Sequence, residues 1–416
     1  MEYSNLCILV FIVLWAITLY WYVKRYQQIG AGGLLIISFL FYSVCSYVVF
    51  NDPTWGAPYK SLKLYPFVFL YLMIMLSILP ILKWDRLRVD KFNSKSTNFV
   101  NAVCWFFIIC TLARIGDFKH FFSGLQMMVI SSGTGLEVYQ EQNRLGEMSS
   151  GTSTISNIFA IFSNLLYDIA VICFLFVLHK KNKNKLLIAG MAISIVICIL
   201  VPITAAQRGP TLERLLVLLI FFIAMKRFLP GAVKKIAKYC FAIFGALVSI
   251  PIAFITIARF ADRGIFTSIL CYFGQQNLYF NNYAFDNNGL RYGDRIFPVF
   301  KKMLGFNNVP IDYFQCRDKY TSLHINDEVF IGYVGDFMLD FGAIFTILIF
   351  AIYTIYTLSK LRVSNGGIFL YQLLPFFFLM HVCMYGGIFL FPFAFSDNYT
   401  IIVYVLMYTC LKVLKI

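Results

Sequence analysis

Long apolar runs alternate with short polar connections along the chain. Most runs approach or exceed the length of about 20 residues that crosses the hydrocarbon core of a bilayer as a helix. The runs cover residues 5–23, 29–50, 64–82, 98–115, 156–178, 186–204, 212–225, 239–258, 334–358, 366–391 and 399–414. The pattern predicts an all-α polytopic membrane protein of about 11 (10–12) transmembrane helices. It also predicts a single integral membrane domain over residues 1–416.

Two connections are much longer than the others, 116–155 and 259–333. The first carries charged residues at helical spacing and is predicted to form a solvated helical cap; they are Glu137, Glu141, Arg144 and Glu147. A structureless loop as long as the second is uncommon in a compact protein, so we expect this segment to be functional.

An amphipathic helix is predicted near the start of the long 259–333 segment. Its apolar residues follow the i, i+3, i+4, i+7 pattern and are Phe266, Ile269, Leu270 and Phe273. A helix of this kind lies in the membrane interface with its apolar face in the acyl region.

The composition supports the membrane interpretation. The chain is 60% apolar and 13% charged, whereas soluble proteins average roughly 45–50% and 25%. A net charge of +15 would suggest a nucleic-acid partner in a soluble protein. Here we expect no nucleic acid, because the distribution of charge between the two membrane faces matters more than its sum.

The basic residues are distributed unevenly between the two sets of alternate connections. One set, including the carboxyl-terminal residues, holds 20 of the 35 Lys and Arg residues, and its acidic residues are Asp85 and Asp90. Basic loops remain in the cytoplasm. The distribution therefore predicts an amino terminus outside, a carboxyl terminus inside and both long connections on the outer face.

The cysteines and histidines indicate no metal site or cofactor. The eleven cysteines are scattered singly without a CxxC pair, and the four histidines are far apart in sequence. Most cysteines lie in apolar runs and are expected to act as small apolar residues. Cys271 and Cys316 lie in the longest polar segment, which leaves a disulfide between them open.

The first candidate site lies before the short run 212–225 and includes Arg208, Gly209 and Pro210. That run makes only about 21 Å of helix at 1.5 Å per residue, so its outer end should lie below the membrane surface. Pro210 suits a first helical turn. A helix amino terminus beside an arginine is a phosphate site. The alternative is that Arg208 snorkels or pairs with Glu213.

The second candidate site is the end of the run 239–258. Arg259 and Arg263 lie four residues apart, on one helical face. Like charges so placed favour an anion between them, and a diphosphate would fit. Alternatively, they anchor the helix at the interface with Asp262 as a local partner.

The third candidate site opens the run 334–358. Asp336 and Asp340 share one helical face near its outer end, where carboxylates are costly without partners. Arg208 and Arg259 are the obvious partners. The pair is either a structural ion-pair site or holds a carboxylate that orients or deprotonates a hydroxyl.

Other general-base candidates precede this run: His324, Asp327 and Glu328. Of these, only histidine has an ordinary pKa near neutrality, which suits general-base catalysis. Considered alone, each basic residue of the long 259–333 segment is expected to be a solvated surface charge; these residues are Arg291, Arg295, Lys301, Lys302, Arg317 and Lys319.

These features together resemble a family. The chain resembles the bacterial O-antigen polymerases, the Wzy-type oligosaccharide repeat-unit polymerases. The resemblance lies in the segments 207–210 and 335–342, in Arg259 and in the large external loop that follows Arg259. The resemblance covers the whole chain in architecture and three short motifs in residues. Members of that family usually have somewhat more spans, often with the amino terminus inside.

The resemblance implies a GT-C-like, metal-independent glycosyltransferase of the bacterial inner membrane. Such an enzyme transfers a growing glycan from undecaprenyl diphosphate to a hydroxyl of a lipid-linked repeat unit at the periplasmic face. Arg208, Gly209, Arg259 and Arg263 would bind the donor diphosphate. Asp336, Asp340 and His324, in that order, would assist the acceptor hydroxyl. Weaker candidates for contacts with the sugars are Tyr279, Tyr283, Arg291, Tyr292 and Arg295. Membrane lipid and a chain-length regulator are the other partners implied.

Three alternatives remain open. An O-antigen ligase uses the same donor and commonly depends on a loop histidine, as His324 would be. A flippase for the lipid-linked unit is a non-enzymatic alternative, although such transporters usually show internal repeats and we found none. An inner-membrane acyltransferase is a weaker alternative, since no His-Asp pair lies in a suitable loop.

Overall fold

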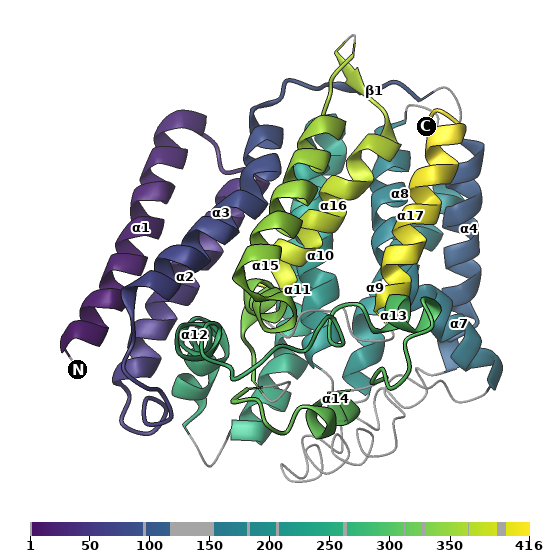
Figure 1. Cartoon of the computed structure of the whole chain (residues 1–416). Coiled ribbons are helices and arrows are strands. Elements are labelled where there is room, and N and C mark those ends of the chain that lie inside the picture. The colour runs from purple at the N-terminus through teal and green to yellow at the C-terminus, as the bar shows by residue number, and fades with distance from the viewer. Residues whose placement is uncertain are drawn as a thin grey trace. The chain divides into compact units, whose positions relative to one another are not determined.

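The computed structural model describes residues 2–94, 97–116, 154–180, 184–204, 208–260, 264–311, 313–325, 329–364, 366–388 and 397–416 (Figure 1). Helices dominate, as predicted, and each predicted span coincides with at least one of them. The helices are α1 (Glu2–Tyr26), α2 (Ala31–Asn51), α3 (Leu64–Arg86), α4 (Asn98–Leu112), α7 (Thr154–Leu165), α8 (Tyr167–His179), α9 (Lys185–Thr204), α10 (Arg208–Met225), α11 (Gly231–Phe260), α12 (Ile265–Tyr283), α13 (Pro298–Met303), α14 (Tyr313–Lys319), α15 (Gly332–Lys360), α16 (Leu370–Tyr385) and α17 (Asn398–Val413).

The remaining elements are short: the 3-10 helix Lys226–Phe228 and the strands β1 (Lys91–Phe92) and β2 (Gly367–Ile368). The predicted helical cap in 116–155 lies almost entirely outside the described residues.

Five described helices are long and apolar enough to cross a membrane, namely α1, α2, α3, α9 and α15. The segments Asn157–Leu165 and Tyr167–His179 form a pair bent by 59° that would make a sixth span. The shorter apolar helices are α4, α16 and α17. These helices are typical of a membrane protein, while the count of eleven spans remains a prediction.

Exposed apolar residues form stripes on the longest helices. On α15, Ile344, Ile352 and Ile355 are each more than 60% exposed, and the exposed face of α1 is similarly apolar at Leu6, Val13 and Ile17. Continuous stripes of exposed apolar side chains are uncommon on soluble monomers and mark surfaces that contact protein or lipid. They agree with the membrane class predicted from composition.

The chain divides into two compact units, which we describe separately. Unit 1 comprises residues 1–89 and 266–408, and unit 2 comprises residues 90–265 and 409–416. Whether the chain forms one integral membrane domain remains a prediction.

In unit 1, α1, α2 and α3 pack side by side, and α3 also contacts α15 and α16 (Figure 1). Aromatic rings fill the contacts between α1, α2 and α3. Trp15 of α1 stacks on Phe39 of α2 with ring centroids 5.2 Å apart. Phe11 of α1 stacks on Phe67 of α3 at 4.9 Å.

Helix α12 extends the amphipathic helix predicted at 266–273 by ten residues. Its second half, beyond the predicted residues, carries polar side chains that contact α2 and the segment before α3. Asn277 donates to Ser46 Oγ of α2 at 3.0 Å, and Asn281 both accepts from and donates to the Lys63 backbone. Gly274 lies so close to α2 that a Cβ there would be 2.7 Å from the Cys45 and Ser46 backbone. These polar contacts explain why α12 continues past the apolar repeat.

In unit 2, α4 packs against α7, α8 and α9, and α10 packs against α8 and α9. Helix α11 contacts α9 around buried Ile203 and Val248. Helix α10 begins at Arg208, four residues before the predicted span, so that Pro210 lies in its first turn as expected.

Helix α15 contains a break that positions the candidate site. Gly342 has φ 74° and ψ 175°, whereas the flanking residues are helical. A positive φ is readily accessible to glycine and costly for other residues. The break divides α15 into a first part that carries Asp336 and Asp340 and a longer apolar second part.

We expect Gly274→Leu to destabilise the protein, because the backbone of α2 cannot move away from the added side chain. The cost should be about 1–3 kcal/mol, the usual penalty of overpacking. It should be measured as the loss of thermal stability of purified protein in detergent. Gly245→Ala in α11 is the control, since a Cβ there meets nothing within 4 Å. Equal stability of both variants would contradict the close approach of α12 and α2.

Candidate functional site

The candidate site of unit 1 is built on the first part of α15. Asp336 and Asp340 are one turn apart on the same face, as predicted. Both carboxylates are buried, with 1% and 0% of each residue exposed. Buried carboxylates need opposite charges and hydrogen-bond donors, and the segment between α12 and α13 supplies them.

Arg291 is the observed partner of both carboxylates. Its Nε donates to Asp340 Oδ1 at 2.7 Å, and its Nη2 donates to Asp336 Oδ1 at 3.3 Å and to the Asp336 carbonyl at 3.2 Å. From the sequence, Arg208 and Arg259 are the expected partners, and the resemblance implies a sugar contact for Arg291. Arg291 is completely buried, so its observed role is to neutralise these acids.

Asp340 also organises the backbone around Arg291. Its Oδ2 accepts hydrogen bonds from the amides of Arg295 and Ile296 at 3.2 and 2.9 Å. The Arg291 amide in turn donates to the Leu339 carbonyl at 2.9 Å. A carboxylate engaged by a guanidinium and two amides has little capacity to take a proton from a substrate, which favours the structural alternative for Asp340.

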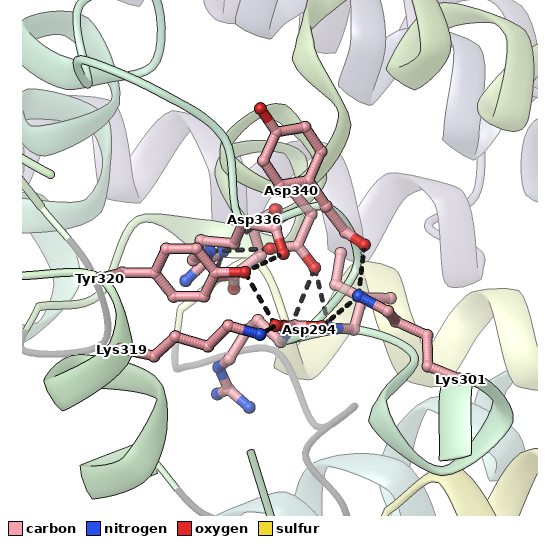
Figure 2. Close-up of polar contacts among 10 residues, drawn as sticks. Asp294, Lys301, Lys319, Tyr320, Asp336 and Asp340 are labelled. Carbon is pink, nitrogen blue, oxygen red and sulfur yellow. Dashed lines mark hydrogen bonds and ion pairs between the residues drawn. The ribbon is translucent and has the colours of Figure 1, made fainter. Parts of the chain in front are cut away.

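A third buried carboxylate, that of Asp294, lies in the segment between α12 and α13, and nothing in the sequence singles it out. Figure 2 shows Asp294 between Lys301, Lys319 and Tyr320. Lys301 binds its Oδ1, while Lys319 Nζ and Tyr320 Oη donate to its Oδ2 at 2.6 and 2.8 Å. The sequence predicts both lysines to be solvated surface charges, whereas in the structure they bind this buried carboxylate.

The charges around Asp294 determine its protonation. Burial alone raises the pKa of this carboxyl, but hydrogen bonds from Lys301, Lys319 and Tyr320 outweigh burial, and the resulting pKa is below its ordinary value. Burial and the carboxylate of Asp294 raise the pKa of Tyr320, so its hydroxyl remains protonated and donates. Asp294 thus joins α13, which carries Lys301, to α14, which carries Lys319.

Two residues with positive φ and the side chain of Asn398 fix the conformation of the segment between α12 and α13. Tyr292 and Gly293 have φ of 55° and 81°, and a Cβ on Gly293 would be 3.1 Å from the ring of Phe341. Asn398, the first residue of α17, accepts from the Val299 amide at 3.0 Å and donates to the Ile296 carbonyl at 2.7 Å. Few other side chains would fit at Gly293, because both its φ and its contact with Phe341 disfavour a Cβ.

His324 lies in an exposed part of the same unit. Its side chain is 43% exposed, and its Nδ1 is 2.6 Å from the Asp286 carbonyl. A carbonyl only accepts, so Nδ1 carries the hydrogen and neutral His324 has its lone pair on Nε2. That tautomer can accept a proton at Nε2. Asp327 and Glu328, the neighbouring base candidates, lie outside the described residues.

Aromatic and charged groups surround His324. The Tyr283 ring lies 6.4 Å from the His324 ring between centroids, and Tyr279 stacks near Tyr283 at 6.3 Å. Lys60 Nζ lies over the Tyr283 ring at 4.7 Å and 4.0 Å from Asp286 Oδ2. We call these five residues the His324 surface.

The predicted diphosphate residues belong to unit 2. Arg208 and Gly209 open α10, and Arg259 is the penultimate residue of α11. The side chains of Arg208 and Arg259 and the whole of Arg263 lie outside what the structure describes. Their predicted role therefore remains a prediction.

The described residues contain neither a metal-binding cluster nor the disulfide that the sequence left open. Among the described residues, no group of three or more His, Cys, Asp and Glu could hold a metal ion. Cys271 and Cys316 are free thiols, so the disulfide left open by the sequence is not formed.

No protein family, curated protein or solved structure matches the chain. The resemblance to O-antigen polymerases accordingly rests on the sequence motifs alone.

We expect Arg291→Met to destabilise the protein by about 3–5 kcal/mol, because it leaves two buried carboxylates without this positive charge. Thermal unfolding of purified protein in detergent measures the effect. Arg362→Met, which changes an exposed arginine just after α15, is the control and should stay within about 0.5 kcal/mol of wild type. An unchanged Arg291→Met protein would show that other groups neutralise these acids.

Stability should depend on pH through Asp294. A carboxyl with a lowered pKa in the folded state stabilises the protein above the unfolded pKa of about 3.9 and loses this contribution as pH falls through the folded pKa. The thermal midpoint of wild type should therefore fall more steeply from about pH 6 to about pH 3 than that of Asp294→Asn. Asp318→Asn, at an exposed position, should retain the wild-type slope. Parallel slopes for wild type and Asp294→Asn would refute this assignment.

Proposed function

We propose that the chain is an inner-membrane O-antigen or surface-polysaccharide polymerase, a metal-independent glycosyltransferase with a polyprenyl-diphosphate donor. It would transfer the growing glycan from undecaprenyl diphosphate to a sugar hydroxyl of a lipid-linked repeat unit at the periplasmic face. The proposal includes eleven spans in a GT-C-like arrangement, an amino terminus outside and the 259–333 segment as the large periplasmic loop.

The observation that carries the proposal is the contact of 2.6 Å between His324 Nδ1 and the Asp286 carbonyl. Because a carbonyl only accepts, this contact places the hydrogen on Nδ1 and leaves the Nε2 lone pair of the exposed imidazole able to accept a proton. Asp340 lacks this property because its oxygens are engaged by Arg291 and two amides. We therefore rank His324 first among the three candidate catalytic residues, before Asp336 and Asp340.

The reaction follows from this assignment. His324 Nε2 takes the proton of the acceptor hydroxyl as the hydroxyl oxygen bonds to the anomeric carbon of the donor sugar. The bond between that carbon and the diphosphate oxygen breaks, and its electron pair leaves with undecaprenyl diphosphate. A general base of this kind contributes typically 10²–10⁴-fold to a rate.

The charge that develops on the diphosphate needs positive partners. In our proposal Arg208, Arg259 and Arg263 supply them, together with the amino terminus of α10, which begins at Arg208. Arginine suits this role because its planar guanidinium group binds phosphate oxygens in pairs.

The His324 surface suits a sugar acceptor. The Tyr283 ring lies next to the imidazole, Tyr279 lies next to Tyr283, and Lys60 adds a donor over the Tyr283 ring. Amphipathic rings of this kind pair apolar contact with a polar end. Tyr279 was a sugar-contact candidate in the sequence analysis, and in our proposal it retains this role together with Tyr283.

An O-antigen ligase is the second candidate, and the same observation favours it. A ligase would use His324 on the same donor but transfer the glycan to the lipid A core. The sugars, the linkage and the identity of the acceptor would be determined by the shape of the occupied site.

The electrophoretic profile of surface glycan from a strain that lacks this protein tests the proposal. A null strain with only core plus one repeat unit, restored to a ladder by wild type, indicates a polymerase. Polymer retained on the lipid carrier with bare core indicates a ligase. Loss of both indicates a flippase or a unit-assembly protein and refutes the proposal.

His324→Ala should lose at least 100-fold in rate, the lower end of a general-base contribution, and should fail to restore the ladder at normal protein levels. The matched control is His179→Ala. Its imidazole Nδ1 also lies 2.8 Å from a backbone carbonyl, that of Phe228, but at the end of α8 in unit 2. A normal ladder with His324→Ala would remove His324 from the mechanism.

A further inference from the structure

Unit 1 carries an exposed apolar turn that lies outside every predicted span. It follows α13 and includes Met303, Leu304 and Phe306, which are 71%, 77% and 57% exposed. Together with Gly305, we call these residues the 303–306 tip. Single exposed apolar residues are normal on protein surfaces, but three within four positions mark a surface that contacts lipid or protein.

Backbone hydrogen bonds give the tip a defined conformation. The Gly305 amide donates to the Lys302 carbonyl at 2.9 Å, and the Phe306 amide donates to the Lys301 carbonyl at 3.0 Å. These two bonds, with a φ of 83° at Gly305, form the Schellman cap that ends α13. The exposed side chains are therefore presented by a fixed backbone, so covering them costs little ordering entropy.

Two lysines lie directly behind the tip, and they share one carboxylate, that of Asp294. Lys301 Nζ lies 5.5 Å from the centre of the aromatic ring of the tip, and it also donates to the Tyr292 carbonyl. Lys319 Nζ also donates to the Asn308 carbonyl at 2.7 Å. Among the described residues, each ammonium group thus uses two of its three N–H groups. The two side chains are 19% and 28% exposed, so an anion at the surface can reach this surplus of positive charge.

The start of α17 fixes the level of α13 relative to the membrane. Asn398, the first residue of α17, accepts from the Val299 amide at 3.0 Å and donates to the Ile296 carbonyl at 2.7 Å. Helix α17 coincides with the predicted span 399–414, and the first residues of a spanning helix lie at the membrane interface. Met303 follows Val299 by four residues, about 6 Å of helix. The tip is therefore within reach of the interface.

We propose that the 303–306 tip inserts into the interface of a bilayer that contains anionic phospholipids. The apolar side chains of the tip enter the acyl region, and Lys301 and Lys319 bind lipid phosphate groups. Apolar side chains beside basic ones are typical of segments that lie in an anionic interface, and long lysine side chains reach from apolar surroundings to the headgroups. This proposal depends on the membrane class of the chain and not on the transferase activity.

The test measures the depth of a nitroxide spin label in full-length protein reconstituted into nanodiscs. Leu304→Cys carries the label in a background of Cys240→Ala and Cys410→Ala, because these two cysteines are exposed and the others are buried. The background protein alone should take up no label. Ser322→Cys, at an exposed polar position of the same unit, is the control. Collisions of the label with oxygen report lipid, and collisions with a water-soluble nickel chelate report water.

In phosphatidylglycerol nanodiscs, the ratio of oxygen to nickel collisions should be about threefold higher for Leu304→Cys than for Ser322→Cys. In phosphatidylcholine, which has no net charge, the ratio for Leu304→Cys should fall by about half. Phe306→Cys should give the same result and keeps the test valid if Leu304→Cys disturbs the cap.

Three results would overturn the proposal, whatever the glycan ladder shows for the transferase. Frequent nickel collisions in both lipids would place the tip in water. Rare collisions with both reagents would indicate that protein covers the tip. Equal ratios in the two lipids would show that the lysines do not select anionic headgroups.

Discussion

The structure of unit 1 depends on one guanidinium group, that of Arg291, enclosed between two acidic side chains of α15. Removing such charges from water is costly, and the cost is recovered only when every group finds partners. Arg291 provides these partners for Asp336 and Asp340. It thereby fixes the chain between α12 and α13 against the first part of α15, and the loop segments around Asp294 are ordered next to this pairing.

Tyr320, which contacts the buried charges, lies only four residues before the exposed His324. The single hydrogen of the Tyr320 hydroxyl is shared between the Arg291 carbonyl and Asp294 Oδ2, each of which lies 2.8 Å from Tyr320 Oη. His324 follows only four residues later, and its amide donates to the Asn287 carbonyl at 3.2 Å. The exposed His324 therefore lies at the edge of a segment whose guanidinium and carboxylate groups are buried.

The helices could be predicted from the sequence far better than the site. An apolar run is a local property, and every predicted span coincides with a helix. The pairing of Arg291 with Asp340 joins residues 49 positions apart, and nothing in a single sequence tells which arginine will reach which carboxylate. The sequence identified Asp336 and Asp340 as needing partners, but the choice of Arg291 and the role of Asp294 arise only from the folded loop.

The break at Gly342 has a consequence for the fit of α15 to the bilayer. The 18 residues that follow it, up to Lys360, make about 27 Å of helix, close to the hydrocarbon thickness of about 30 Å. This part alone can therefore cross the bilayer, and it can tilt about Gly342 where the lipid is thinner or thicker. The two carboxylates before the break would keep their geometry in membranes of different thickness.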